Sequence, residues 1–463
     1  MESYNIHSAD SIIEFAKNLK GKTLRHACGD EIILHGYKGK GNFGQILEKY
    51  YFGYEPNSDT DPDFKEAGLE LKTSPLKILK NGEYRSKERL VLNIINYTEV
   101  HKEKFETSSF LKKNSHLLLV FYLYSKEIDL INYDIKLVDE WLYPERDLAI
   151  IRRDWELIIT KIKNGKAHEL SEGDTFYLGA CTKGSTALKS FRDQPFNKKK
   201  AKQRAFSLKQ GYVNHIIANI SKEEKAIYGK ILKYPELINE STTIEDVVLE
   251  KFQKFYNKTS DEIEEHLNLK LNKRAKSYFA NLTKAILGIQ LDQKIEEFEK
   301  ADIIVKAVRL MENNLPKENM SFPAFEYETL AKTRWEDSDF KNILESKFFI
   351  VFYKYQGNNL ILKKAKFWNM KNSDILEAKK VWKRMKKLIL EGKIVREITK
   401  NGTRKTYFPK LSENRISHVR PHAQNSKDTF PLPVADEKTK VNCYTKHSFW
   451  LNAAYIRNEI YLK

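Results

Sequence analysis

Three side chains near residue 70 have the types and spacing that metal-assisted hydrolysis of a phosphate ester requires. Pro62-Asp63 is followed, after six intervening residues, by Glu70-Leu71-Lys72. Alternate residues of a strand point to opposite faces, so Glu70 and Lys72 share one face. Two carboxylates can bind Mg²⁺, and a nearby lysine can orient the attacking water or stabilise the charge of the transition state. The pattern alone also fits a solvated strand with a Glu–Lys pair.

Alternating helical and strand-like patterns surround this motif. Helical spacing is found at 11–20, 43–52 and 154–163, and strand-like patterns at 69–73, 90–95, 116–124 and 176–178. The runs at 90–95 and 116–124 are densely apolar, as the central strands of a sheet are. The sequence therefore predicts an α/β fold in which a mixed central β-sheet is flanked by helices.

Three pairs of segments recur in the same order, 230 or 231 residues apart. They are LVFYLY (119–124) with IVFYKY (350–355), KERLVLNIINY (87–97) with KENMSFPAFEY (317–327), and FETSSF (105–110) with WEDSDF (335–340). AFSLKQGYV (205–213) and SFWLNAAYI (448–456) are also loosely alike. A constant offset indicates a duplicated domain rather than convergent strand composition. We expect domains at 1–225 and 226–463.

The second copy lacks the acidic residues of the motif. Aligning the motif's lysine with Lys306 puts Ile304 in the place of Glu70, and Glu297 near the place of Asp63. An isoleucine cannot bind a metal ion, so the second copy is expected to keep the fold and lose the chemistry. This asymmetry indicates that the C-terminal half binds DNA without cutting it.

The charge balance favours a polyanionic partner. The chain has 463 residues, with 81 Lys and Arg against 63 Asp and Glu, a formal net charge of +18. Basic side chains release counterions from a phosphate backbone, so nucleic acid is favoured over anionic lipid. Cys28, Cys181 and Cys443 show no metal-ligand spacing, which favours a reducing compartment. No signal peptide or membrane-spanning run is found, so an intracellular protein without a membrane partner is expected.

PDFKEAGLELKTSP (62–75) resembles the active-site segment of MutH, the mismatch-repair endonuclease that nicks at GATC. ILEKYYFG (46–53), FETSSFLKK (105–113) and AFSLKQGYV (205–213) continue this likeness. Most of the chain is similar to the larger GATC-cutting restriction enzymes of the Sau-three-A type, through SKERLVLNIINY (86–97), GKAHELSEG (165–173), CTKG (181–184), KAKQRAFSLK (200–209) and HVRPH (418–422). The resemblance implies two tandem MutH-like domains of the PD-(D/E)xK nuclease superfamily, with only the first catalytic.

For the catalytic centre the resemblance implies five residues: Asp63, Glu70, Lys72, Glu48 and Lys113. Asp63 and Glu70 would hold Mg²⁺, and Lys72 would assist attack. Glu48 lies on the polar flank of a helix, where a solvated glutamate is the simpler interpretation. Lys112 is an equal candidate for the position given to its neighbour.

For DNA contact the resemblance implies Lys183, Ser207 and Lys209 in the first domain. Lys183 matches a lysine that reads bases, and contact with the DNA backbone is an equal alternative. Ser207 stands where MutH has a tyrosine that senses adenine methylation. A serine is too short for the same contact, so the resemblance does not carry discrimination of methylated adenine over to this chain.

The second domain keeps an Arg-Pro pair that precedes the reading lysine in MutH, whereas the first domain has Cys181-Thr182 there. The pair is Arg420-Pro421 within HVRPH, and we expect Arg420 and His422 to contact DNA. A metal site formed by His418 and His422 is a weaker alternative.

Together, these features predict a type II restriction endonuclease of the bacterial cytoplasm. It would recognise double-stranded GATC, cut before the G with Mg²⁺, and use its second domain as an allosteric effector site. With one catalytic centre per chain, a monomer in solution that dimerises on DNA is expected. A strand-nicking repair endonuclease and a catalytically silent DNA-binding protein are the alternatives.

Overall fold

The chain passes between two structural units three times. Unit 1 comprises Met1–Ile244 and Asp292–Ile303, and unit 2 comprises Glu245–Leu291 and Ile304–Lys463. The computed structural model describes residues 4–29, 42–57, 59–183, 190–221, 227–233 and 242–463. The division expected between residues 225 and 226 lies outside the described residues. Within them, no helix is long and apolar enough to cross a bilayer.

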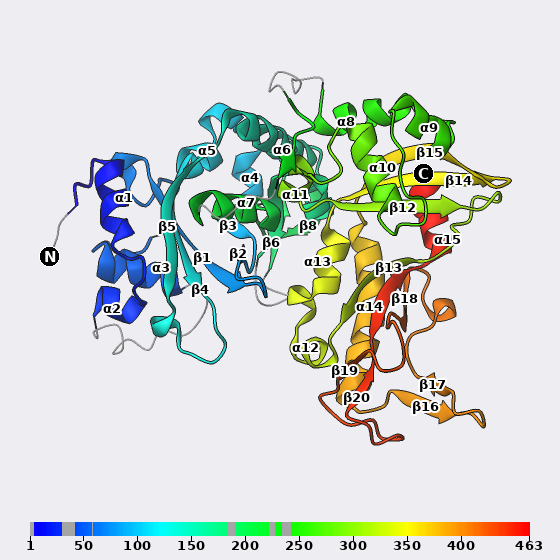
Figure 1. Ribbon diagram of the computed structural model, residues 1–463. Coiled ribbons are helices and arrows are strands. Elements are labelled where there is room, and N and C mark those ends of the chain that lie inside the picture. Colours follow the sequence, from blue (N-terminus) through cyan, green and yellow to red (C-terminus); the bar gives the residue numbers. More distant parts are fainter. Residues whose placement is uncertain (1–3, 30–41, 58, 184–189, 222–226, 234–241) are drawn as a thin grey trace. The chain divides into compact units, whose positions relative to one another are not determined.

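Unit 1 contains a four-stranded mixed sheet in the order β2-β1-β4-β5. Its strands are β1 (Glu70–Ile78), β2 (Tyr84–Ser86), β4 (His116–Leu123) and β5 (Ile135–Leu142). β1 and β4 run parallel, and the other pairs are antiparallel. The helices α1 (Ala9–Lys17), α2 (Leu24–Cys28) and α3 (Asn42–Ile46) lie on one side of this sheet and α7 (Gln210–Ser221) on the other (Figure 1). With both faces covered, the apolar run of β4 is buried from Leu117 to Tyr122, as predicted for a central strand.

A second, three-stranded sheet of unit 1 is antiparallel. It consists of β3 (Leu90–Ile94), β9 (Arg204–Leu208) and β6 (Leu178–Thr182), with β9 in the centre. Asp154 of the long helix α6 (Glu145–Lys163) accepts the backbone N–H groups of residues 176, 177 and 178, at 2.8, 2.6 and 2.9 Å. This buried carboxylate fixes the start of β6, and its own burial raises its pKa to about 6.

Between these elements unit 1 has shorter segments: α4 (Tyr97–Val100), η4 (Phe105–Thr107), α5 (Ser109–Asn114), η5 (Leu130–Asn132), η6 (Ala167–Glu169), η7 (Glu172–Asp174), the hairpin β7 (Phe191–Gln194) and β8 (Asn197–Lys202), and β10 (Tyr228–Gly229) paired with β11 (Lys294–Ile295).

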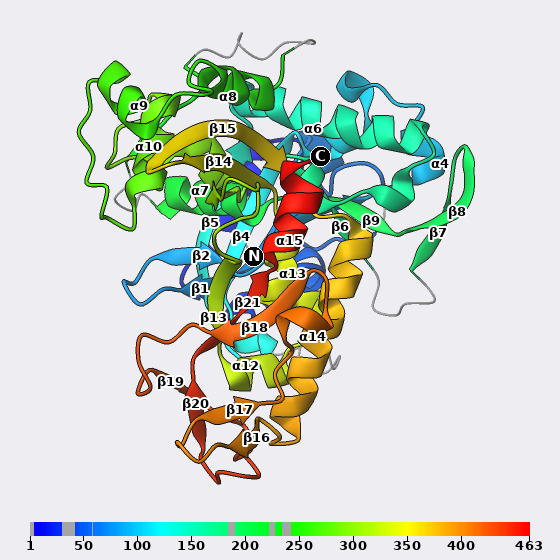
Figure 2. The ribbon, with the colours of Figure 1, turned by 90° about the vertical axis from the view of Figure 1, so that its right-hand side faces the viewer.

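Unit 2 repeats both sheets. β12 (Ile304–Leu310), β14 (Phe348–Gln356) and β15 (Asn359–Trp368) form one, and β13 (Met320–Phe325), β21 (His447–Leu451) and β18 (Ser417–Pro421) form the other. The 19-residue helix α14 (Asn372–Leu390) lies beside the second sheet (Figure 2). Further segments are α8 (Ile244–Gln253), α9 (Ser260–His266), α10 (Tyr278–Leu287), α12 (Tyr327–Lys332), η9 (Trp335–Asp337), α13 (Asp339–Glu345), β16 (Val395–Ile398), β17 (Arg404–Thr406), η10 (Leu411–Glu413), β19 (Thr429–Pro431), β20 (Cys443–Thr445), α15 (Ala453–Tyr455) and η11 (Ile456–Tyr461).

The strand registers of the two units match the offset found in the sequence. β1 pairs with β4 in parallel so that Lys72 faces Leu119, and β12 pairs with β14 in parallel so that Lys306 faces Ile350. Position 304 of unit 2 therefore corresponds to Glu70 of unit 1. The α/β architecture with two related domains, predicted from the repeat, is confirmed.

A buried carboxylate–phenol pair is also duplicated. Tyr212 donates its hydroxyl to Asp147 at the start of α6 at 3.0 Å, and Tyr455 donates to Asp374 at the start of α14 at 2.7 Å. In each unit this hydrogen bond ties the long helix to the segment that follows the central strand of the second sheet.

The segment Asp292–Ile303 belongs to unit 1 although it precedes a strand of unit 2. Its helix α11 (Glu296–Lys300) carries a buried ion network, in which the Lys300 ammonium lies 3.0 and 2.9 Å from the two Asp147 oxygens and 2.8 Å from Glu296. Arg146 pairs with the same Glu296 oxygen at 2.6 Å. A buried charge is tolerated only where it is paired in this way.

The same segment is the counterpart of the loop that precedes β1. In the strand register, Glu297 corresponds to Asp63, and its carboxylate accepts the backbone N–H groups of Ile231 and Leu232 at 3.0 and 2.9 Å. Asp302 accepts a hydrogen bond from the N–H of Gly211 in α7 at 2.8 Å. A β-carbon on Gly211 would overlap the carbonyl oxygen of Glu299, so this close approach requires glycine. In the second copy, the segment that corresponds to this loop therefore has a structural role, and its carboxylates bind backbone N–H groups of unit 1.

His447 of unit 2 gives a prediction for stability against pH. It is buried in β21, and burial lowers the pKa of its imidazole to about 4. Below pH 6.5 the imidazole is protonated in the unfolded chain but stays neutral in the folded chain. The contribution of His447 to the free energy of unfolding is therefore complete above pH 6.5 and is lost as the pH falls towards 4. The expected loss is about 3 kcal/mol. Urea unfolding of His447→Phe should show a weaker pH dependence than the wild type between pH 7 and 4. Parallel curves would contradict this assignment.

Candidate active site

The loop before β1 brings Asp63 and Glu70 together through reciprocal hydrogen bonds. The N–H of Asp63 donates to Glu70 Oε2 at 2.9 Å, and the N–H of Leu71 donates to Asp63 Oδ2 at 3.0 Å. A 3₁₀ turn, η3 (Lys65–Ala67), and Gly68 with φ +64° fold the intervening residues back, a conformation that favours glycine. The two carboxylates are thus held side by side by the backbone.

Two lysines lie at the same oxygen of Glu70. The Lys72 ammonium donates to Glu70 Oε1, and the Lys113 ammonium lies 3.7 Å from that atom. Lys113 also donates to the carbonyl of Asp59 at 2.7 Å. Glu70 is only 1% exposed; burial raises its pKa, with the Asp63 charge adding to the effect and the lysines opposing it.

Lys112 is placed differently from its neighbour. Its ammonium pairs with Asp61, and its side chain is 61% exposed. Of the two lysines considered at this position, Lys113 is the one beside Glu70, because α5 turns it towards β1.

Glu48 lies at the same cluster. It is in a π-helical turn, η2 (Leu47–Tyr51), which directly continues α3. A β-carbon on Gly44 would lie 3.7 Å from Glu48 Oε1 and 3.4 Å from Thr73 Oγ1, so the carboxylate faces the strand that carries Lys72. Burial, then the Asp63 charge, raises the pKa of Glu48 to about 7. Single π-helical turns are frequent at functional sites.

These five side chains form an acidic cluster that two lysines border. The negative charges of Asp63, Glu70 and Glu48 lie close enough to affect one another, which favours a cation between them. At Glu70, the ammonium groups of Lys72 and Lys113 supply that positive charge. In the described part of the chain, no group of three or more His, Cys, Asp or Glu side chains is placed so that it could hold a metal ion. The set instead fits Mg²⁺, which commonly takes one or two carboxylates and completes its shell with water and phosphate.

The residues expected to contact DNA in unit 1 differ in exposure. Lys183 follows β6 and is half-buried, with its N–H donating to Gln203. Ser207 and Lys209 are 1% and 8% exposed, and the Lys209 ammonium donates to the carbonyl of Thr175. In this conformation Lys209 supports the fold, and only Lys183 of the three is partly open to solvent.

Arg420 and His422 of unit 2 are exposed at the end of β18 and share a neighbour, Trp450 of β21. The Arg420 guanidinium lies 5.4 Å from the indole centroid, and the His422 ring meets the indole edge-to-face at 5.9 Å. His418 is buried, with Nδ1 2.6 Å from Asn452 Oδ1, so it is not paired with His422 in a metal site. We call Arg420, His422 and Trp450 the β18–β21 cluster.

Trp450 was not singled out from the sequence, although a signal was present. Placing AFSLKQGYV over SFWLNAAYI puts Trp450 at the position of Ser207. The registers agree, since Ser207 faces Gly179 and Trp450 faces His418 in the corresponding strand pairs. The position has a small side chain in unit 1 and a large aromatic one in unit 2.

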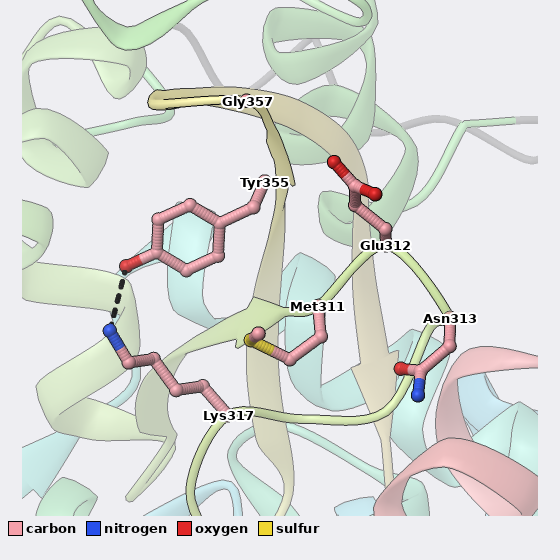
Figure 3. Close-up of a pocket in the computed structure, with 6 residues that line it drawn as sticks. All are labelled: Met311, Glu312, Asn313, Lys317, Tyr355 and Gly357. Carbon is pink, nitrogen blue, oxygen red and sulfur yellow. Dashed lines mark hydrogen bonds between the residues drawn. The ribbon is translucent and has the colours of Figure 1, made fainter.

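A hollow in unit 2 lies apart from every residue named for chemistry. Its volume is about 390 Å³, and its lining is Met311, Glu312, Asn313, Lys317, Tyr355 and Gly357 (Figure 3). Lys317 donates to the hydroxyl of Tyr355 at 3.3 Å across its mouth. One acid and one lysine at a loop do not form a catalytic arrangement.

Comparisons with known proteins agree on one class of enzyme. The family model of the DNA mismatch repair enzyme MutH matches residues 52–154. The type II restriction enzyme Sau3AI of Staphylococcus aureus is 40% identical over 497 aligned residues, covering 99% of each chain. MutH of Shewanella woodyi is 27% identical over 35% of this chain and 69% of its own, and MutH of Vibrio campbellii is 26% identical over 45% of this chain and 93% of its own.

Proposed function

Because this chain belongs to the Sau3AI family of type II restriction enzymes, we propose that it recognises double-stranded GATC and uses Mg²⁺ to cut both strands before the G. The chain is a site-specific deoxyribonuclease that acts on double-stranded DNA. Cleavage at that position leaves four-base 5′ overhangs. The observation that carries the catalytic proposal is the reciprocal hydrogen bonding of Asp63 and Glu70 beside two lysines.

In the proposed centre Asp63 and Glu70 would hold the metal ion, with water and the DNA phosphate completing its coordination. When bound, Mg²⁺ polarises the phosphodiester and lowers the pKa of a coordinated water. Lys72 directs its ammonium at the attacking water or at the charge that develops on the phosphate. Lys113, fixed by the Asp59 carbonyl, adds positive charge beside Glu70. Glu48, with a pKa of about 7, gives the cluster a carboxylate that can hold a proton near neutral pH.

The proposal limits chemistry to unit 1. At the corresponding positions of unit 2, Ile304 replaces Glu70, and the carboxylate of Glu297 is engaged by two backbone N–H groups of unit 1. A double-strand break then needs two chains or two visits. We expect the protein to be a monomer in solution and to dimerise on DNA, with a cleavage rate that depends on protein concentration.

Unit 2 serves as a DNA-binding effector domain in this proposal. The β18–β21 cluster supports it, because an exposed arginine can donate to guanine O6 and N7 and an aromatic ring can contact a base or sugar. The two sites would be engaged together before efficient cutting.

The effector role predicts a specific defect in Arg420→Ala. Loss of one base-reading arginine costs about 1–3 kcal/mol of binding, so the activation of cutting by a second GATC duplex should weaken by roughly 5- to 150-fold. The measurement is plasmid cleavage against added duplex concentration. Lys463→Ala, which removes the same charge from a surface pair with Glu459, should behave as wild type. Equal responses of all three proteins would contradict the effector role.

A plasmid digestion tests the function as a whole. Supercoiled DNA with a few GATC sites is incubated with Mg²⁺ or with EDTA, and the cut ends are sequenced. Discrete linear fragments ending before G support the proposal. Open circles would indicate a nicking enzyme, and intact supercoils with retained DNA binding would indicate a silent binding protein.

A further inference from the structure

Tyr54 has a hydroxyl group that the structure leaves without a partner. Its oxygen is buried, and it makes no hydrogen bond among the described residues. Gly53, with φ +79°, ends the π-helical turn, and the N–H of Tyr54 then donates to the carbonyl of Glu48 at 3.0 Å. Its ring meets Phe64 edge-to-face at 5.3 Å, and Phe64 directly follows Asp63. The backbone of both acidic segments therefore positions this ring.

The surroundings of the hydroxyl are negatively charged. Burial, reinforced by the charges of Asp63, Glu48 and Glu70, holds the pKa of Tyr54 well above its ordinary value. The phenol therefore keeps its proton and remains a hydrogen-bond donor in surroundings that contain the charges of three carboxylates. A buried donor left unpaired costs about as much as a lost hydrogen bond, so a partner is expected in the working enzyme.

We propose that Tyr54 is a positioning residue of the catalytic centre, whose hydroxyl donates a hydrogen bond to the Asp63 carboxylate when the site is loaded with metal and DNA. Among the described residues, the N–H of Leu71 engages Asp63 Oδ2 and no hydrogen bond is made to Oδ1, and an ionised carboxylate accepts several hydrogen bonds. The hydrogen bond fixes the orientation of Asp63 beside Glu70. This assignment rests on the function proposed above and deepens it.

Neighbouring tyrosines show what a structural hydroxyl looks like in this cluster. Tyr4, whose ring lies 6.0 Å from Phe64, donates to the carbonyl of Phe52 at 2.6 Å, and Tyr51 donates to that of Phe15 at 2.8 Å. Both are satisfied by backbone within the fold. Tyr54 differs because its buried hydroxyl has no hydrogen-bond partner among the described residues, while its ring contacts the residue that follows Asp63.

Tyr54→Phe removes only this hydroxyl and separates the two roles. With the full chain and a GATC duplex, kcat is expected to fall about 10- to 100-fold at unchanged KM, since a hydrogen bond to a charged group is lost. Without DNA, the rise in Tm caused by added Mg²⁺ should shrink, while Tm without Mg²⁺ stays equal to that of the wild type or higher. Tyr4→Phe is the matched control, with a lower Tm and an unchanged kcat.

The outcomes are distinguishable. A Tyr54→Phe enzyme with wild-type kcat and a wild-type response to Mg²⁺ would overturn the assignment. So would a loss of kcat that appears only with a lowered Tm and disappears on cooling, because that behaviour is purely structural. A wild-type enzyme that cuts no DNA in Mg²⁺ would instead overturn the proposed function, and the assignment with it.

Discussion

Glu70→Gln should reduce the rate of DNA cleavage on the order of 10³-fold while leaving binding of the duplex in EDTA unchanged. The substitution keeps the volume of the buried side chain but removes the charge that two lysines and a metal ion would share. The loss should appear in kcat, because the Glu70 carboxylate and the metal ion act most strongly in the transition state, where negative charge builds up on the phosphate. Single-turnover cleavage and an electrophoretic binding assay measure the two properties separately.

A neighbouring glutamate provides the control for this experiment. Glu66 lies in the same loop but is exposed, and Glu66→Gln makes the same chemical change four residues away. It should cut at the wild-type rate. If Glu70→Gln retained a tenth or more of the wild-type rate, Glu70 would not be a ligand of the catalytic metal.

Lys300→Met should destabilise unit 1 by about 3–5 kcal/mol. The substitution leaves Asp147, which is completely buried, without its close cationic partner, and weakens the contact between α11 and α6. Breaking one side of a buried pair is costly because the remaining charge is uncompensated. Hydrogen exchange of the α7 amides, read by mass spectrometry, and the urea midpoint of unit 1 would measure the loss.

Two further variants separate charge compensation from simple loss of a side chain. Lys294→Met removes a lysine of the same segment whose pair with Glu299 is half-exposed, so its effect should stay within roughly 0.5 kcal/mol. Adding Asp147→Asn to Lys300→Met should recover much of the stability, because the stranded charge disappears while an acceptor for Tyr212 remains. If Lys300→Met were as stable as Lys294→Met, the network would not hold the segment.

Local pattern was sufficient for much of the fold and for the central motif. The alternation at Glu70-Leu71-Lys72 and the apolar run of β4 follow from the burial of one or both faces of the sheet. Burial of a face constrains the residue types along each strand, so these strands could be predicted from the sequence. The internal repeat predicted the second copy because its strands obey the same constraint. Asp63 and Glu70 were found by spacing.

Other features depend on contacts that leave no local pattern. Nothing near Glu48 or Tyr54 in the sequence distinguishes them from solvated or packing residues, since most of the charged groups that surround them come from β1 and from the loop before it. Lys209 gave no sign of burial, because the carbonyl that binds it belongs to a distant loop. No sequence pattern marked the segment Asp292–Ile303, and its contacts with residues far away in the sequence, such as Asp147 and Gly211, assign it to unit 1.

That interleaved path has a consequence for how the enzyme is made. Unit 1 cannot be completed when residue 244 leaves the ribosome, because α11 lies beyond the first helices of unit 2. Bacterial translation adds about 5–20 residues per second, so the remaining stretch to residue 303 delays completion by roughly 3–12 s. Until then Asp147 lacks its partner, Lys300, and unit 1 lacks the segment Asp292–Ile303. A nascent chain would thus complete unit 1 only once synthesis of unit 2 is under way.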